Sequence, residues 1–242
     1  MKSITPLWNV PKNVKALTTT RADGASTGAY ASFNLGDHVG DDPAAVRANR
    51  AALRDAFKLP NEPLWLKQVH GISIANAQTA QAGATADGAW ADRRGVVLAV
   101  LTADCMPIFL CDRKGTRIAL VHAGWRGLAA GIVEEGVRAL RVPARELLAH
   151  LGPGIGSEAY EVGEDVRDVF VGRDANAASA FRAVGAGKWH ADMYALARLR
   201  LRDLGVEAIT GGEHCTARER EVFYSSRRDG VTGRMASLLW LE

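Results

Sequence analysis

The sequence predicts an α+β protein built as a layered α/β sandwich of mixed sheets. Short apolar runs rich in β-branched residues occur at 96–102 and 117–122 and are typical of buried strands. Stretches with helical spacing of apolar residues lie at 128–140 and 191–204. Strands and helices do not alternate regularly, which favours a sandwich over a doubly wound parallel sheet. No linker, repeat or low-complexity tract interrupts the chain, so we expect one domain over residues 1–242.

The N-terminal part of the chain predicts a strand, a long loop and a helix. The strand covers residues 14–20 and leads into 21–42, which is rich in Gly, Ser and Asp. Loops of this length in compact domains are often functional, although a simple surface excursion with an Asn and Gly turn is the alternative. The residues in it that could contact a ligand are Arg21, Asn34 and His38. A helix begins at Asp42-Pro43, because Asp can cap a helix and Pro fits its first turn.

The same patterns predict the remaining elements. Residues 64–77 contain two strand-like runs that break at His70, which is therefore expected in a turn between strands. A short strand at 146–151 ends in the glycine-rich turn 152–156, which lacks the Lys and Ser/Thr of a phosphate-binding P-loop. We further expect helices at 164–171 and 191–204 and strands at 206–212, 221–230 and 234–242.

The composition of the chain limits which kinds of partner and which cellular compartment we expect. With 48% apolar and 24% charged residues the chain is typical of a globular protein, and no stretch reaches membrane-spanning length. A net charge of +3 is too small to predict nucleic-acid binding without a concentrated basic face. The first residues lack the apolar core of a signal peptide, and three cysteines are too few and too odd in number for a disulfide framework. We therefore expect a cytoplasmic protein with reduced thiols.

A thiol and two imidazoles are the strongest candidates for chemistry. Cys105 and His122 lie at the polar ends of two neighbouring apolar runs, and His70 lies in the expected turn before them. Two imidazoles and one thiolate form an acceptable zinc site with a position left for water. Their separations of 35 and 17 residues match no local ligand motif, so a buried thiol beside hydrogen-bonded histidines remains the simpler interpretation. Asp104 either orients one of the histidines or holds the turn.

Without a metal, the same residues suggest a different mechanism. Cys105 would act as a nucleophile activated by His122 as its base. A second cluster combines Arg227 and Arg228 with the aromatic residues just before them. Adjacent arginines and aromatic rings can bind phosphate and stack on a base, but a solvated turn or an internal Arg-Asp229 pair explains them equally well.

Seven separate blocks together resemble the YfiH/YlmD family, which was long labelled polyphenol oxidase or laccase-like and is now regarded as a family of purine nucleoside phosphorylases. The blocks occur in the family's order and span nearly the whole chain. They are TTRADGASTGAYASFNLGDHVGDD, KQVHG, TADCMPI, HAGWRG, GPGIG with YEVGEDV, the HCT triplet and FYSSRRDGVTGRMAS.

The resemblance implies a zinc site formed by His70, Cys105 and His122, with Cys105 and His122 also catalytic. It implies phosphorolysis of adenosine, inosine, guanosine and methylthioadenosine by phosphate, and deamination of adenosine to inosine. For the substrates we expect Asn34, Arg227 and Arg228, with Arg228 also catalytic; which arginine contacts phosphate stays open. The expected partners are these small molecules, without nucleic acid or membrane, and the expected state is a monomer or small homo-oligomer. The family fold is an α/β sandwich similar to that of bacterial deamidating toxins with a Cys-His pair.

Departures from the family pattern keep alternatives open. Ser157 and Ala159 stand where many relatives have cysteines, and Ser226 stands where they have tyrosine. Copper is the less favoured metal, because laccase-type clusters need many histidines and this chain has six without a His-x-His pair. A metal-free thiol hydrolase or amidase is the main alternative. A non-catalytic module with a structural zinc would need a fourth ligand, for which His214 and Cys215 are the candidates.

Overall fold

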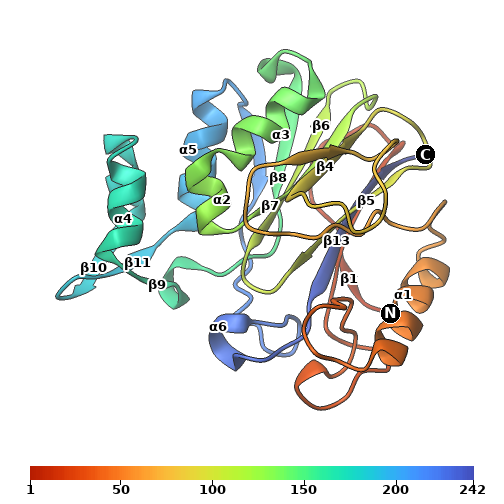
Figure 1. Ribbon diagram of the computed structural model, residues 1–242. Coiled ribbons are helices and arrows are strands. Elements are labelled where there is room, and N and C mark those ends of the chain that lie inside the picture. The colour runs from red at the N-terminus through yellow and green to blue at the C-terminus, as the bar shows by residue number, and fades with distance from the viewer.

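The computed structural model describes all residues 1–242 and contains three sheets (Figure 1). The first has the strand order β1-β2-β13-β5 and is antiparallel throughout. Its strands are β1 (Ser3–Ile4), β2 (Val14–Thr19), β13 (Met235–Leu241) and β5 (Val97–Thr102). The chain end at β13 thus lies between two strands from its first half.

The second sheet is mixed and has the order β12-β8-β6-β7-β4-β3. Its strands are β12 (Ala208–Gly211), β8 (Leu147–Leu151), β6 (Met106–Asp112), β7 (Ile118–Ala123), β4 (Gly88–Ala91) and β3 (Ile74–Asn76). The two edge pairs are parallel and the inner pairs antiparallel. The expected α+β class with mixed sheets is confirmed.

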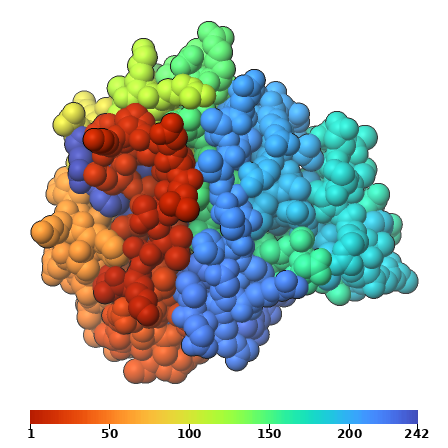
Figure 2. Space-filling view, turned by 180° about the vertical axis from the view of Figure 1, so that it is seen from behind, coloured from red at the N-terminus to blue at the C-terminus, as the bar shows by residue number.

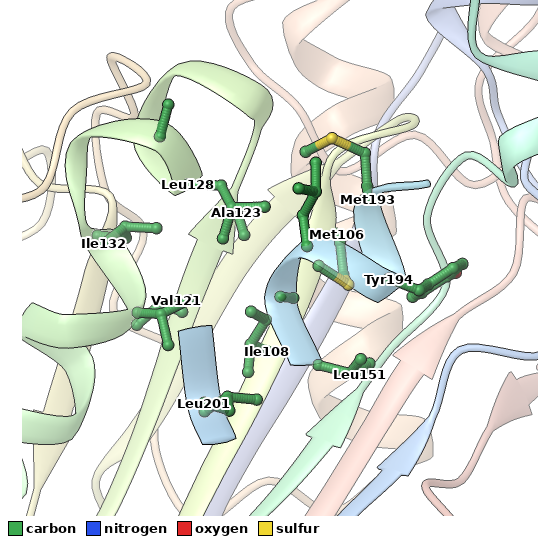
Figure 3. Packing of buried hydrophobic residues seen from close by; sticks show 14 of the residues in the cluster. Met106, Ile108, Val121, Ala123, Leu128, Ile132, Leu151, Met193, Tyr194 and Leu201 are labelled. Carbon is green, nitrogen blue, oxygen red and sulfur yellow. The ribbon is translucent and has the colours of Figure 1, made fainter. Parts of the chain in front are cut away.

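Alternating side chains of the central strands face two different layers. On one face of β6, Phe109 and Cys111 pack toward Leu98 and Leu239 of the first sheet. On the other face Ile108 packs in the larger cluster, where Figure 3 shows Leu201 near it and Leu128 and Ile132 farther away in the same layer. Both faces of β6 and β7 are therefore covered, which explains why every residue of these strands is buried.

Helices cover the outer faces of the two sheets. The helices α2 (Trp125–Ala130), α3 (Ile132–Leu140) and α5 (Met193–Asp203) lie on the second sheet (Figure 1). On the first sheet lies α1 (Pro43–Ala56), whose Leu53 packs with Ala99 and Leu238. Asp42 caps α1 by accepting the N–H of Ala44, as expected from its position. The layers are helix, sheet, sheet and helix, so the predicted sandwich is confirmed.

A third, small sheet forms a lobe at one side of the molecule. It has the order β10-β11-β9, with β10 (Phe181–Gly185), β11 (Lys188–Ala191) and β9 (Glu161–Gly163), and carries α4 (Glu164–Val171). The lobe projects at the side in both views (Figures 1 and 2). Short 3-10 turns occupy Gly28–Tyr30, Ala144–Glu146, Ser157–Ala159 and Ala175–Ala180.

Several elements differ from those expected. Residues 221–230 form turns and the short α6 (Ser226–Asp229) instead of a strand, because Ser225 caps that turn by accepting the N–H of Arg228. The helix expected at 128–140 is two helices, separated by Gly131 with φ of 114°. Residues 64–73 pair through isolated bridges, and β6 was not among the expected strands. No helix has the length and apolarity needed to cross a membrane.

Candidate active site

The structure brings His70, Cys105 and His122 together, with one donor atom from each lying within 4.8 Å of the others. Cys105 directly precedes β6, and His122 lies on the neighbouring β7 opposite Pro107. The Cys105 Sγ and His70 Nε2 atoms are 3.7 Å apart. The two imidazole rings meet edge to face, with centroids 4.8 Å apart. The three residues do meet, but Cys105 lies beside His122 because it directly precedes the unexpected strand β6, and not because β5 and β7 are neighbours in one sheet.

A buried carboxylate, Asp87, organises two of these three residues. Its Oδ1 lies 2.9 Å from Nδ1 of His122 and accepts the backbone N–H of His70 at 2.8 Å. Its Oδ2 accepts the N–H groups of Val69 and Gly71. These bonds hold His70 in the left-handed region, with φ of 60°. Burial raises the pKa of Asp87, but His122 and the backbone N–H groups outweigh this and hold it below its usual range.

Asp104 forms its hydrogen bonds with residues other than His70 and His122. Its carboxylate accepts the Oγ1–H of Thr216 and the backbone N–H of Arg227, each at 2.7 Å. Its carbonyl accepts the N–H of Ile155. Of the two expected roles, Asp104 therefore holds the turn at Cys105 and joins it to the segments that carry Thr216 and α6.

A glycine is required beside the three side chains. A Cβ at Gly124 would lie 2.8 Å from Cδ2 of His70 and 3.0 Å from Sγ of Cys105. The backbone conformation at Gly124 is extended, so the reason for glycine is space and not a special dihedral angle. The close approach of this backbone keeps His70 and Cys105 in place.

The charges of the thiol and the imidazole shift each other's protonation. Burial raises the pKa of the Cys105 thiol, but the charge of His122 and hydrogen bonds with both histidines outweigh it and lower the pKa to about 6. Burial lowers the pKa of His122, whereas the charge of Cys105 and the bond to Asp87 raise it to about 9. Without a bound ion, the site therefore favours a thiolate beside an imidazolium.

The donor set fits one metal ion. With Asp87 on Nδ1, His122 presents Nε2 as its free donor, and a carboxylate behind a ligating histidine is a common feature of metal sites. Two imidazoles and a thiolate suit zinc and leave an open position. This is the one group of three or more His, Cys, Asp or Glu side chains in the chain with metal-ligand geometry, and it includes neither His214 nor Cys215 as a fourth ligand. A multi-copper cluster would need further donors.

The three residues open into a cavity of about 500 Å³, within the roughly 300–1,000 Å³ usual for small-molecule sites. Its other polar lining residues include His38, Gln68, Tyr160, Arg227 and Arg234. They come from the long N-terminal loop, the segment 64–73, the residue before β9 of the lobe, α6 and the residue before β13. The cavity thus gathers segments from the whole length of the chain.

The substrate residues expected from the sequence occupy three different environments. Arg227 lines the cavity, with its guanidinium 4.9 Å from the ring centroid of Tyr160. Arg228 uses all five N–H groups on Asp229 and on the carbonyl groups of Thr216, Ala217 and Phe223. Asn34 is fully buried and bonded to its own loop. The cavity lining includes neither Arg228 nor Asn34, and their substrate roles stay predictions.

Sequence reasoning missed Asp87 and Arg234. Asp87 stands among small residues of an apparent loop, and Arg234 directly precedes the last strand, inside the FYSSRRDGVTGRMAS block but with nothing there to distinguish it. His38 was a candidate ligand contact, and it does line the cavity. What distinguishes Asp87 and Arg234 is their tertiary contacts, which spacing along the chain does not reveal.

These features define a layered α+β protein with a single His-Cys-His centre in a polar cavity. The chain belongs to the family described as multi-copper polyphenol oxidoreductase laccase, which it matches over residues 15–242. It is 48% identical to the purine nucleoside phosphorylase YfiH of Shigella flexneri over 99% of both chains. It is 49% identical to a purine nucleoside phosphorylase of Pseudomonas aeruginosa, over 99% of this chain and 98% of the relative.

Solved structures show the same fold. A Neisseria meningitidis protein of the DUF152 family superposes with a TM-score of 0.97 at 50% identity, covering 100% of both chains. YlmD from Geobacillus stearothermophilus superposes with a TM-score of 0.88 at 32% identity, covering 96% of this chain and 93% of the other. The resemblance to the YfiH/YlmD family is confirmed.

Proposed function

We propose that the protein is a zinc-dependent purine nucleoside phosphorylase. Its substrates would be adenosine, inosine, guanosine and methylthioadenosine, and it would also deaminate adenosine to inosine. The observation that carries the proposal is the His70, Cys105 and His122 centre at the edge of a polar cavity large enough for a small molecule. The names of the relatives, nearly half identical over the whole chain, support the reaction class.

In this proposal His70, Cys105 and His122 hold the zinc ion and Asp87 fixes the tautomer of His122. A zinc ion at this position would supply Lewis acidity beside the substrate. Arg227 would contribute positive charge for the phosphate or the developing purine anion. Asn34 and Arg228 would act indirectly, by holding the loop and the α6 turn that shape the cavity.

In phosphorolysis a phosphate oxygen bonds to C1′ of the ribose while the bond from C1′ to the purine nitrogen breaks. The purine leaves with that electron pair and takes up a proton, and ribose 1-phosphate remains. Bringing an anion to the sugar is favoured by cationic side chains in a site shielded from water. In deamination, water replaces the amino group of adenosine and ammonia leaves.

The decisive experiment is chromatography of the products formed by zinc-loaded protein from adenosine, with and without phosphate. Adenine and ribose 1-phosphate formed only with phosphate would support phosphorolysis, and inosine formed without phosphate would support deamination. Inosine, guanosine and methylthioadenosine are then tested in the same way. Unchanged nucleosides under all conditions would refute the proposal.

A thiol hydrolase or amidase is the second candidate, and one observation favours it. Asp87, His122 and Cys105 form a carboxylate-imidazole-thiol series in which the pKa of Cys105 is lowered to about 6. A thiol enzyme keeps its activity in a metal chelator and loses it to iodoacetamide. The proposed zinc enzyme loses activity in chelator and regains it when zinc is restored.

We further propose that residues 1–242 form one domain and that the protein works in the cytoplasm as a monomer or small homo-oligomer. Light scattering after size exclusion would give the oligomeric state. A single cooperative unfolding transition by calorimetry is expected for one domain, whereas two separate transitions would contradict it.

A further inference from the structure

One cation in the cavity, Arg234, has no direct ion-pair partner, because the anionic groups that act on it, Cys105 and Asp104, lie beyond salt-bridge distance. Arg234 stands just before β13, and Nη1 donates to the carbonyl groups of Thr232 and Gly233. Its Nε and Nη2 make no hydrogen bond to the protein, and no carboxylate lies within ion-pair distance. A guanidinium taken partly out of water without a counter-ion is unfavourable unless a ligand supplies the charge.

The surrounding loop holds this arginine in one position. The Oδ1 atom of Asn34 accepts the backbone N–H of Arg234 at 2.8 Å and that of Gly36 at 2.9 Å. A Cβ at Gly36 would lie 2.8 Å from Cγ of Arg234, so the side chain is packed directly on the loop backbone. Asn34 in turn donates to Asp41. Arg234 is therefore fixed before any ligand arrives, which lowers the entropy that binding costs.

The other two arginines are less suited to the same task. Arg228 has no N–H group left to donate. Arg227 is exposed, and it is engaged by the Tyr160 ring and by the Glu161 carbonyl. Arg234 is more buried than Arg227 and keeps two adjacent donor nitrogens, the arrangement that binds two oxygens of one phosphate.

We propose that Arg234 is the anchor for the inorganic phosphate co-substrate, bound through Nε and Nη2, with Asn34 as its positioning residue. This inference rests on the proposed function for the identity of the anion. The long loop thus contributes to the site, because its residues Asn34 and Gly36 contact the backbone and the side chain of Arg234. Arg227 then contacts the nucleoside side of the cavity with Tyr160.

The test compares zinc-loaded Arg234→Gln and Arg234→Lys with the wild type. The KM for phosphate is expected to rise about 10- to 100-fold in Arg234→Gln, while the KM for inosine changes much less. Arg234→Lys keeps the positive charge but lacks the paired donors, so its KM for phosphate is expected to lie between those of the wild type and Arg234→Gln. This variant also tests the proposal if Arg234→Gln does not fold. Arg113→Gln, an exposed arginine at the far end of β6, is the matched control with unchanged phosphate KM.

A second measurement does not depend on turnover. Phosphate should raise the unfolding temperature of wild-type and Arg113→Gln protein above that in chloride of equal ionic strength, and this rise should be absent in Arg234→Gln. If the rise depends on Arg234 but the wild type performs no phosphorolysis, the anion site stands and the proposed function fails. An unchanged phosphate KM in both Arg234 variants, or a larger increase in Arg227→Gln, would overturn the proposal.

Discussion

The molecule contains two clusters in which a carboxylate, a histidine and a cysteine lie together, and the two clusters differ in structure. In both, a carboxylate holds Nδ1 of the histidine: Asp87 lies 2.9 Å from His122, and Glu219 lies 3.0 Å from His214. Asp87 is fully buried, whereas the Glu219 side chain is about one-third exposed. The first cluster gains His70 as a second imidazole, and the second has none.

The two thiols are used differently as well. Sγ of Cys105 faces His70, while Sγ of Cys215 accepts the backbone N–H of Gly156. Glu219 also accepts the N–H of Cys215, so it closes a tight turn. The two clusters therefore share a carboxylate-histidine pair beside a cysteine without sharing the rest of the arrangement. What separates the clusters is a second imidazole and a carboxylate kept from water.

The largest expected difference between the clusters is in turnover. Cys105→Ala should reduce kcat/KM by about a thousandfold or more, because it removes a ligand of the proposed metal while the fold is retained. Cys215→Ala should keep activity near that of the wild type. Both are checked by nucleoside turnover and by circular dichroism. Unchanged turnover in Cys105→Ala would refute both the zinc and the thiol mechanisms.

The second difference concerns the two carboxylates. Asp87→Asn should weaken zinc affinity by about 10- to 100-fold, because the amide loses the charge that supports His122 and the backbone of His70. Glu219→Gln should leave zinc affinity unchanged. Competition with a chromophoric chelator measures both. Equal losses of zinc affinity in Asp87→Asn and Glu219→Gln would contradict the different roles expected for the two carboxylates.

The third difference is in the pH dependence of thiol alkylation in metal-free protein. Thiolate is the reactive form, so lowering the pKa of Cys105 to about 6 should make its alkylation rate fall about tenfold between pH 7 and pH 5. Burial raises the pKa of Cys111 to about 12, and that thiol should stay unreacted. Mass spectrometry of peptides after iodoacetamide gives the rates. Added zinc should protect Cys105 from alkylation. An alkylation rate of Cys105 whose pH profile has no midpoint near pH 6 would contradict the assignment of a thiolate.

The smallest expected effects come from a matched pair of glycines. A Cβ at Gly124 would meet Cys105 and His70 at 3.0 Å or less, and one at Gly156 would meet Cys215 at 3.1 Å. Gly124→Ala should weaken zinc binding a few-fold by moving two ligands, whereas Gly156→Ala should change only the unfolding temperature, by a few degrees. Chelator competition and calorimetry separate the two effects. Wild-type zinc affinity in Gly124→Ala would show that the site tolerates this displacement.

The sandwich could be predicted because its signals are local, and the candidates His70, Cys105 and His122 came from their residue types and positions together with the family resemblance. Apolar periodicity marks β5 and β7, and each of the three residues stands at the polar end or break of an apolar run. The prediction of a strand at 221–230 was wrong, because the aromatic residues that suggested a strand are equally compatible with a buried turn. Phe223 and Tyr224 are consecutive and both fully buried in one cluster with Met235, whereas in a strand with one solvated face only one of two consecutive residues would be buried.

The supporting residues could not be predicted in the same way. Asp87 is 35 residues from His122, and Asn34 is 200 residues from Arg234. Neither pair forms a motif, since such contacts depend on how the sheets and loops are placed in space. The three residues were singled out by their chemistry and by the family resemblance, while the residues that hold them in position become visible only in the fold.

The place of β13 between β2 and β5 has a consequence for synthesis on the ribosome. The hairpin of β6 and β7, with Cys105 and His122, is complete when half of the chain has been made. β2 and β5 must wait for their shared neighbour until the last residues emerge, and Arg234 arrives with it. The residues of the His-Cys-His centre are therefore synthesised before Arg227 and Arg234, which line the same cavity.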